Sequence, residues 1–221
     1  MAVATSNGRL KVEAVPEIQT YGIDLEPLEV AELLVPIRGT APLIVHAFGE
    51  KARKEMGDKQ GTTEITVKRK KAPKDPVALY EAARYRLSDG RDGFPAAGFK
   101  SAIVNSARFF AQAKMVDLKI AILVLADEKG LVAIDGTPAM REDTVRIGAM
   151  TKTTDLRYRP EFVDWGAMLR IQYLPQIVTA RGVVNLVNAA GLGGIGEWRP
   201  SAPMSKNGSF GTFRVVTEGD R

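Results

Sequence analysis

Apolar and polar positions along the chain fall into patterns that predict strands and helices in alternation. The run 30–48 (VAELLVPIRGTAPLIVHAF) is rich in leucine and β-branched residues, and it predicts a first core strand that breaks at Gly39 and Pro42. Further along, apolar side chains recur at spacings of three and four at Phe99, Ile103, Ser106 or Ala107, and Phe110. This spacing predicts an amphipathic helix that packs on a sheet.

The middle of the chain predicts further strands. A short strand is expected at residues 85–87, before a turn at Asp89 and Gly90. The continuous apolar run 118–125 (LKIAILVL) predicts a buried strand, and residues 131–136 (LVAIDG) predict its hairpin partner. Residues 137–159 mix charged and apolar positions with a poor period, and irregular strands fit them best.

The C-terminal part predicts a second strand, helix and strand. Residues 165–174 (WGAMLRIQYL) alternate as a half-buried strand, with Leu169, Ile171 and Tyr173 on one face. Thr179 is a fair N-cap for a helix over 181–190, which precedes a glycine-rich loop and a closing strand ending at residue 216. Two β-α-β passes of this kind predict an α+β fold with an antiparallel sheet and two main helices, ferredoxin-like or RRM-like.

This pattern also suggests a domain organisation. Residues 1–26 are polar and predict an N-terminal arm, and residues 27–221 predict a single domain. Within that domain, the charged segment 50–76 has few apolar residues and ends in two prolines, so it predicts an insertion outside the core. Its TTEITVK stretch is compatible with a projecting β-hairpin.

Charge is concentrated in this insertion. Residues 51–74 hold nine basic and three acidic residues, a net charge of +6, whereas the rest of the chain has a net charge of −1. A local excess of this kind favours binding of a polyanion, and nucleic acid is the favoured partner in a chain without a membrane-binding helix. The alternative is a solvated loop whose charges only maintain solubility.

Composition excludes several chemistries. The chain has no cysteine and one histidine, His46, so disulfides, iron–sulfur clusters and cysteine–histidine zinc sites are excluded or improbable. No cofactor, metal site or catalytic group is predicted, because the acidic residues (Asp127, Glu128, Asp135, Glu142 and Asp143) show no productive metal spacing. The sequence lacks an apolar run of 18 residues and a signal-peptide pattern, so a cytoplasmic protein with no membrane partner is expected.

Two local motifs suggest contacts with a phosphate chain. Lys100 lies near the start of the first helix, where backbone N–H groups are free, and Asn105 and Arg108 follow it. After the second helix, Gly193, Gly194 and Gly196 permit positive φ and close backbone approach. This glycine cluster fits either a helix C-cap or one wall of a nucleic-acid groove.

The order of three motifs resembles the RAMP superfamily, the RRM-fold backbone subunits of CRISPR effector complexes. These motifs are IRGTAPLIVHAFGE, then GFPAAGFKSAIVNSARF, and finally GLGGIGEWRP followed by GSFGTFRVV. Alanines replace the serines usual in the turn at 95–100, and the aspartate with which some members cleave RNA has no convincing counterpart. The chain also looks like uncharacterised bacteriophage proteins.

The resemblance implies that the insertion 50–76 is a thumb that folds over bound nucleic acid and touches a neighbouring subunit. Together, charge, motifs and resemblance predict a non-catalytic protein of a bacterial or phage-infected cell that binds single-stranded RNA or DNA as a homo-oligomer or filament. Alternatives are a virion-type structural subunit and, with less support, a metal-dependent nuclease. The predicted contact residues are Lys51, Arg53, Lys54, Lys68, Arg69, Lys70, Lys71, Lys100, Asn105, Arg108, Gly193, Gly194, Gly196, Trp198 and Arg199.

Aromatic side chains are the weakest part of this prediction. Phe48, Tyr158, Trp198 and Phe210 are candidates for stacking on bases. Phe48 and Phe210 fit a hydrophobic core better, whereas Trp198 lies between Glu197 and Arg199 in a polar loop, where either role is open.

Overall fold

A computed structural model of the chain describes residues 22, 25–47, 75–147, 153–203 and 208–217. Its main sheet has four strands in the order β4-β8-β1-β9. The strands are β1 (Ala31–Gly39), β4 (Ile122–Val124), β8 (Gly166–Tyr173) and β9 (Phe213–Val215). Smaller sheets hold β2 (Leu43–Ile44) with β7 (Thr153–Phe162) and β6 (Ala139–Ile147), and β3 (Gly93–Pro95) with β5 (Leu131–Ala133).

Helices fill the connections between the main strands. The two long ones are α3 (Ala96–Asn105), extended by the 3-10 turn η1 (Ser106–Phe109), and α5 (Ala180–Gly193). Shorter helices are α2 (Pro76–Ala82) and α4 (Met115–Ala121). Among the described helices, none has the length and apolarity needed to cross a membrane.

The strand order confirms the predicted ferredoxin-like fold. Taken in chain order, β1, β4, β8 and β9 are the first to fourth strands of a β-α-β-β-α-β unit, and across the sheet they lie as 2-3-1-4. All three neighbouring pairs are antiparallel, with Val35 opposite Leu169, Val124 opposite Ile171, and Ile37 opposite Val215. Each β-α-β crossover skips one strand position, as this fold requires.

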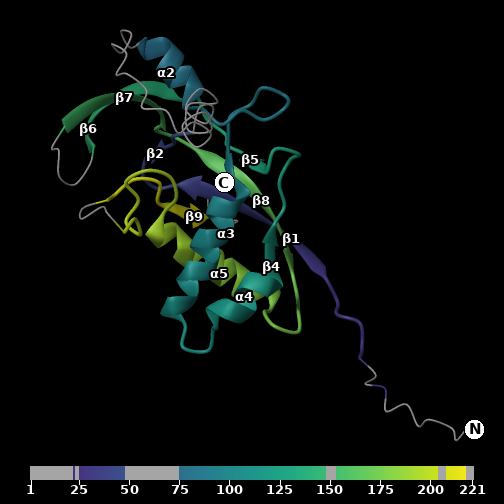
Figure 1. The fold of residues 1–221 in the computed structure, drawn as a ribbon. Coiled ribbons are helices and arrows are strands. Elements are labelled where there is room, and N and C mark those ends of the chain that lie inside the picture. Colours follow the sequence, from purple (N-terminus) through teal and green to yellow (C-terminus); the bar gives the residue numbers. More distant parts are fainter. Residues whose placement is uncertain (1–21, 23–24, 48–74, 148–152, 204–207, 218–221) are drawn as a thin grey trace, which may run out of the picture.

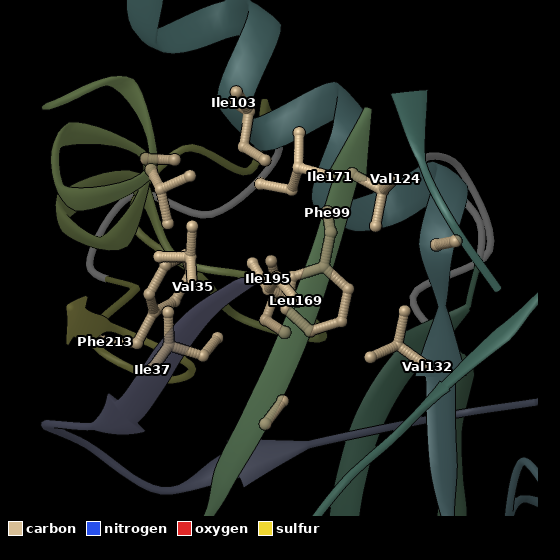
Figure 2. Packing of buried hydrophobic residues seen from close by; sticks show 14 of the residues in the cluster. Val35, Ile37, Phe99, Ile103, Val124, Val132, Leu169, Ile171, Ile195 and Phe213 are labelled. Atoms are coloured by element: carbon tan, nitrogen blue, oxygen red, sulfur yellow. The ribbon is translucent and has the colours of Figure 1, made fainter. Parts of the chain in front are cut away.

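The core lies between this sheet and the two long helices (Figures 1 and 2). Val35 and Ile37 from β1 and Leu169 and Ile171 from β8 lie around Phe99 of α3, and all five are almost fully buried. The predicted stripe of the first helix is thereby confirmed. The second helix also begins as predicted, because the Thr179 side chain accepts a hydrogen bond from the Gly182 N–H at 3.1 Å.

The other face of the main sheet carries no helix in Figure 1. Its outward positions include Leu34, Met168 and Leu123, which are 62%, 52% and 47% exposed, and two ion pairs, Glu32 with Arg170 and Arg38 with Asp164. No aromatic side chain points outward from these four strands, whose residues are all described. RRM domains stack bases on aromatic residues of this face, so this sheet lacks the usual means of RRM readout.

The predicted hairpin over residues 118–125 and 131–136 is wrong. The first half of the apolar run is helical: α4 ends at Ala121, and it buries Leu118 and Ala121 at a spacing of three. The turn at 127–130 does form, because Asp127 accepts hydrogen bonds from the N–H groups of Lys129 and Leu131. The strands then separate, with β4 joining β8 and β5 joining β3. A short apolar run does not distinguish helix from strand, and pairing partners are set by tertiary packing.

Two other expectations differ from the structure. Residues 85–87 form no strand, and only an isolated bridge links Arg86 to Asp92. The Arg84 guanidinium donates hydrogen bonds to the Asp92 carboxylate, and this contact closes the turn between them. Within the stretch 137–159, residues 139–147 and 153–159 belong to a regular antiparallel pair, with β6 and β7 in register from Ala139 opposite Glu161 onward. The insertion 50–76, apart from its last two residues, and most of the arm 1–26 lie outside the described residues.

Candidate nucleic-acid interface

Residues from the two long helices converge at one small surface cleft. The buried Ser106 side chain holds the helices together, with its Oγ 2.7 Å from the Ile103 carbonyl oxygen and 2.9 Å from that of Leu186. Above this contact lies the α3–α5 cleft, lined by Ala102, Asn105, Ser106, Arg108, Phe109, Ala189, Ala190, Gly193 and Ser201. Three predicted contact residues, Asn105, Arg108 and Gly193, are therefore neighbours in space.

The shape of the cleft limits what it can bind. Its volume is about 10 Å³, which is room for a single water molecule. A ligand therefore lies across it instead of entering it. Ser101, Asn105 and Arg108 are exposed along one side of α3 and η1, and Asn105 Nδ2 lies 3.4 Å from Ser101 Oγ as a hydrogen-bond donor. Gly193 has no side chain, so a phosphate can approach the backbone there.

Phe109 supplies an exposed aromatic surface at the edge of the cleft. Its side chain is 60% exposed, and the Arg108 guanidinium carbon lies 5.5 Å from its ring centroid. An arginine over an aromatic ring is an arrangement that stacks on nucleobases. Sequence reasoning missed Phe109 and Ser201. The sequence did contain a signal that Phe109 is exposed: of the adjacent residues Phe109 and Phe110, only Phe110 continues the spacing of the apolar stripe.

Lys100 does not line this cleft. It is half-buried on α3, and with 3.6 residues per turn it lies about 100° around the helix from Ser101. The structure thus separates Lys100 from Asn105 and Arg108, although all three lie on one helix. The predicted residues Lys51, Arg53, Lys54, Lys68, Arg69, Lys70 and Lys71 lie outside the described residues, as does Phe48.

Two glycines of the loop pack against the protein's own backbone. Gly194 is the C-cap residue of α5, with φ of 68°, and a Cβ there would lie 3.0 Å from the carbonyl oxygens of Phe210 and Gly211. Gly196 has φ of 76°, and a Cβ there would lie 2.5 Å from the Ile44 carbonyl oxygen. Positive φ and close packing explain why glycine occupies both positions. Of the two alternatives for the glycine cluster, Gly194 therefore fits the helix C-cap, a role that requires no ligand.

Trp198 belongs to a second group, the arginine–tryptophan cluster (Arg141, Arg159, Trp198 and Phe210). The Trp198 ring lies 5.5 Å from the Arg141 guanidinium carbon, 5.3 Å from that of Arg159 and 5.9 Å from the Phe210 ring. These cation–π contacts join β6 and β7 to the C-terminal loop. Trp198 also has an unusual φ of 51°, and Arg199 next to it donates a hydrogen bond to the Gly196 carbonyl oxygen at 2.8 Å.

Carboxylates balance the charge of this cluster. Arg141 and Arg159 are directly opposite in the β6–β7 pair, where two like charges repel. Asp143 accepts a hydrogen bond from Arg141 Nε at 2.8 Å, and its other oxygen lies 3.5 Å from Arg159 Nη1. Glu161 pairs with Arg141, and Glu197 lies 3.8 Å from Arg159. The sequence signal is an acid two residues after each arginine, because this spacing puts both on one face of a strand.

Arg159 is unusual for an arginine because its side chain is almost fully buried. Its side chain is only 2% exposed, and burial lowers the pKa of its guanidinium from the ordinary value. Within the described residues, its Nε and Nη1 atoms have no hydrogen-bond partner. The cation is therefore held by Asp143, Glu197 and the face of Trp198, and it fixes where the loop docks.

His46 lies close enough to this cluster for Arg159 to affect its charge. Burial, and then the positive charges of Arg159 and Arg157, lower the pKa of its imidazole below the ordinary value of 6.5. The folded protein therefore holds fewer protons than the unfolded chain below about pH 6.5. The contribution of His46 to the free energy of unfolding is therefore smallest at acidic pH.

We expect the free energy of unfolding to fall as the pH decreases from about 7 to about 5, and His46→Gln to reduce this fall. The depressed pKa sets the sign: stability is present above the unfolded pKa and is lost below it. Urea denaturation followed by circular dichroism at several pH values measures the effect. An unchanged pH dependence in His46→Gln would contradict the assignment.

The acidic residues considered for catalysis are engaged or dispersed. Asp143 is paired with arginines, Asp127 accepts backbone hydrogen bonds in its turn, and Glu128 contacts the Ser88 hydroxyl. In the described parts of the chain, no three histidine, aspartate or glutamate side chains are placed to hold a metal ion.

Fold and cleft together define an α+β protein of ferredoxin-like topology with a small cleft on its helical side, lined by alanines and by polar side chains of α3 and η1. No family model matches the chain, and no curated protein sequence matches it. Among solved structures, the crystal structure of Cmr6 from Pyrococcus furiosus is similar over 86% of this chain and 100% of that chain, with a TM-score of 0.41 and 8% sequence identity. At this level of similarity the fold assignment depends on the strand order of the chain itself, and the RAMP resemblance stays a prediction.

Proposed function

We propose that this protein binds single-stranded nucleic acid, RNA or DNA, across the α3–α5 cleft and without catalysis. The observation that carries the proposal is the convergence of Asn105, Arg108, Gly193 and Ser201, which come from separate parts of the sequence, beside the exposed ring of Phe109. Arginine, amide and hydroxyl groups bind phosphate and sugar, and an arginine-backed aromatic ring stacks on a base. The basic insertion 50–76 adds charge that attracts the strand.

The helical side is favoured over the open sheet face for a chemical reason. On the open face, Arg38 and Arg170 are already paired with carboxylates, and the outward apolar residues are aliphatic. Aliphatic side chains offer no π-surface to a base. At the cleft, in contrast, Arg108 has no carboxylate within ion-pair distance among the described residues. Arg108 is thus available for a phosphate.

We expect Arg108→Ala and Phe109→Ala each to weaken binding of a labelled single-stranded oligonucleotide. Stacking contributes about 1–3 kcal/mol per base, so Phe109→Ala should raise Kd about 5- to 150-fold. Fluorescence anisotropy with RNA and DNA of the same sequence measures Kd. Arg38→Ala is the matched control, because it removes an exposed arginine from the open sheet face.

The insertion is tested by salt dependence. Each contacted phosphate on a single strand contributes about 0.7 to the slope of log K against log salt. Reversing the charges of Lys68, Arg69, Lys70 and Lys71 should therefore lower the slope by up to about 3. No binding of either oligonucleotide at low salt would refute the proposal. If only Arg38→Ala weakened binding, the binding site would lie on the open sheet face instead of the cleft.

The RAMP resemblance further suggests a cytoplasmic subunit that assembles along the strand or within a larger nucleoprotein complex. A virion-type structural role is the second candidate, and the exposed apolar residues that precede β1 favour it. Negative-stain images of nuclease-treated protein separate the two: ordered rings or tubes without nucleic acid support the structural role. Degradation of labelled RNA in magnesium, abolished by Asp135→Ala, would instead support a nuclease.

A further inference from the structure

The lead segment, residues 25–30, exposes apolar side chains that nothing in the described structure covers. Leu25 is 79%, Leu28 67% and Val30 59% exposed. Figure 1 shows this segment continuing from β1 away from the body of the domain. Glu26 and Glu29 are its only charged residues. A short peptide whose two acidic side chains lie between apolar ones is suited to docking in an apolar groove with cations beside it.

Such a groove lies at one end of the helical layer. Its volume is about 340 Å³, and it is lined by Phe110, Gln112, Ala113, Lys114, Asp117, Leu118, Ile177, Val178, Thr179, Gly182, Asn185 and Leu186. Most of the lining is apolar, and Ile177 at the groove is 46% exposed. The volume falls within the range of about 300–1,000 Å³ that is typical of organic ligand pockets. Leucine side chains are therefore suitable occupants.

The charges around this groove complement the lead segment. Lys114 lines the groove, and Arg181 follows directly after the first residue of α5. Within the described residues, neither cation lies within ion-pair distance of a carboxylate. Asp117 is the one acidic residue in the lining. The two cations outnumber this carboxylate. Their attraction to Glu26 and Glu29 favours association and selects the orientation of the lead segment in the groove.

The lead segment and the groove lie at the same end of the domain. Ala31, the first residue of β1, is opposite Tyr173 of β8, and Tyr173 is opposite Ile122 of β4. Ala121 ends α4 immediately before Ile122, and α5 begins shortly after Tyr173. Two copies that meet through this end can each present a lead segment to the groove of the other. Such mutual exchange closes a two-fold symmetric dimer.

We propose that the protein forms a symmetric dimer in which residues 25–30 of each copy occupy the groove of the other. Leu25 and Leu28 fill the apolar lining, while Glu26 and Glu29 face Lys114 and Arg181. The interface is small, so the dimer dissociates on dilution. It forms without nucleic acid, and its test is independent of the proposed function.

Sedimentation velocity of nuclease-treated protein over about a hundredfold range of concentration tests this dimer. The wild type should change from monomer to dimer, whereas Leu28→Glu should stay monomeric throughout. Lys114→Glu should raise the dimer dissociation constant about tenfold or more, and adding Glu29→Lys to it should restore most of the loss. Val163→Glu is the control, because Val163 is 68% exposed but lies between β7 and β8, away from the groove.

Two results would overturn the proposal. One is a wild-type protein that stays monomeric at every concentration, which is also the result expected if the segment docks in its own groove. The other is a dimer that Leu28→Glu leaves intact, which would place the interface elsewhere. Far-UV circular dichroism of each variant confirms that it is folded.

Discussion

Arg159→Ala lowers the free energy of unfolding by about 3–5 kcal/mol, the usual cost of removing one partner of a buried ion pair. Arg159 is the largest fully buried side chain in the described structure, and Asp143 beside it is 4% exposed. The substitution leaves Asp143 with Arg141 alone and opens a cavity beneath Trp198. Urea denaturation followed by circular dichroism measures the loss.

Two variants separate charge from burial in this prediction. Arg159→Met keeps most of the volume but removes the cation, so its loss reports mainly the uncompensated Asp143 carboxylate. Arg38→Ala removes an arginine from an exposed ion pair, whose side chains are 59% and 78% exposed, and should cost less than about 1 kcal/mol. If Arg159→Ala cost no more than Arg38→Ala, the cluster would not hold the C-terminal loop.

Gly191→Ala should destabilise the protein by about 3 kcal/mol, at the upper end for overpacking. The Cβ of the alanine would overlap the carbonyl oxygen of Phe213, where α5 lies directly on β9. Strand β9 is only three residues long, and Val215 N–H also donates a hydrogen bond to the Asn188 side chain of α5. Moving α5 therefore separates an edge strand from the core.

Gly193→Ala is the matched control, two residues further along the same helix. A Cβ at Gly193 would meet Ser201 at 3.4 Å, an acceptable contact. Replacing a helical glycine by alanine stabilises by about 0.5–1 kcal/mol, so the two alanine variants should shift the denaturation midpoint in opposite directions. Equal losses in both would contradict the packing described for α5. The Gly193 variant also narrows the α3–α5 cleft and should weaken oligonucleotide binding.

The glycine cluster shows how far sequence reasoning reaches. Glycine after a helix indicated either a cap or a close approach, and the sequence could not say what approaches. In the structure, Gly194 faces the backbone of Phe210 and Gly211, Gly196 faces Ile44, and only Gly193 of the cluster faces the cleft. Each neighbour lies far from its glycine in the sequence or on another element, so periodicity and composition carry no information about it.

Local sequence did determine the main elements. The alternation in β8, the stripe of α3 and the Thr179 cap of α5 follow from short-range rules, and all three are confirmed. The order of these elements then restricted the topology to a ferredoxin-like fold. Between them, the apolar run 118–125 was wrongly expected to be strand throughout, because its first half packs as α4.

By itself, the sequence determined the fold class, the concentration of positive charge in the insertion, and the absence of cysteine chemistry. Those properties depend on composition and on side-chain periods that a single segment contains. Only the tertiary structure decided that Asn105, Arg108 and Gly193 meet, that Trp198 lies against two arginines, and that Phe109 faces solvent. The reason is physical: a site of this kind is formed by residues from different elements, and their meeting depends on how the helices pack on the sheet.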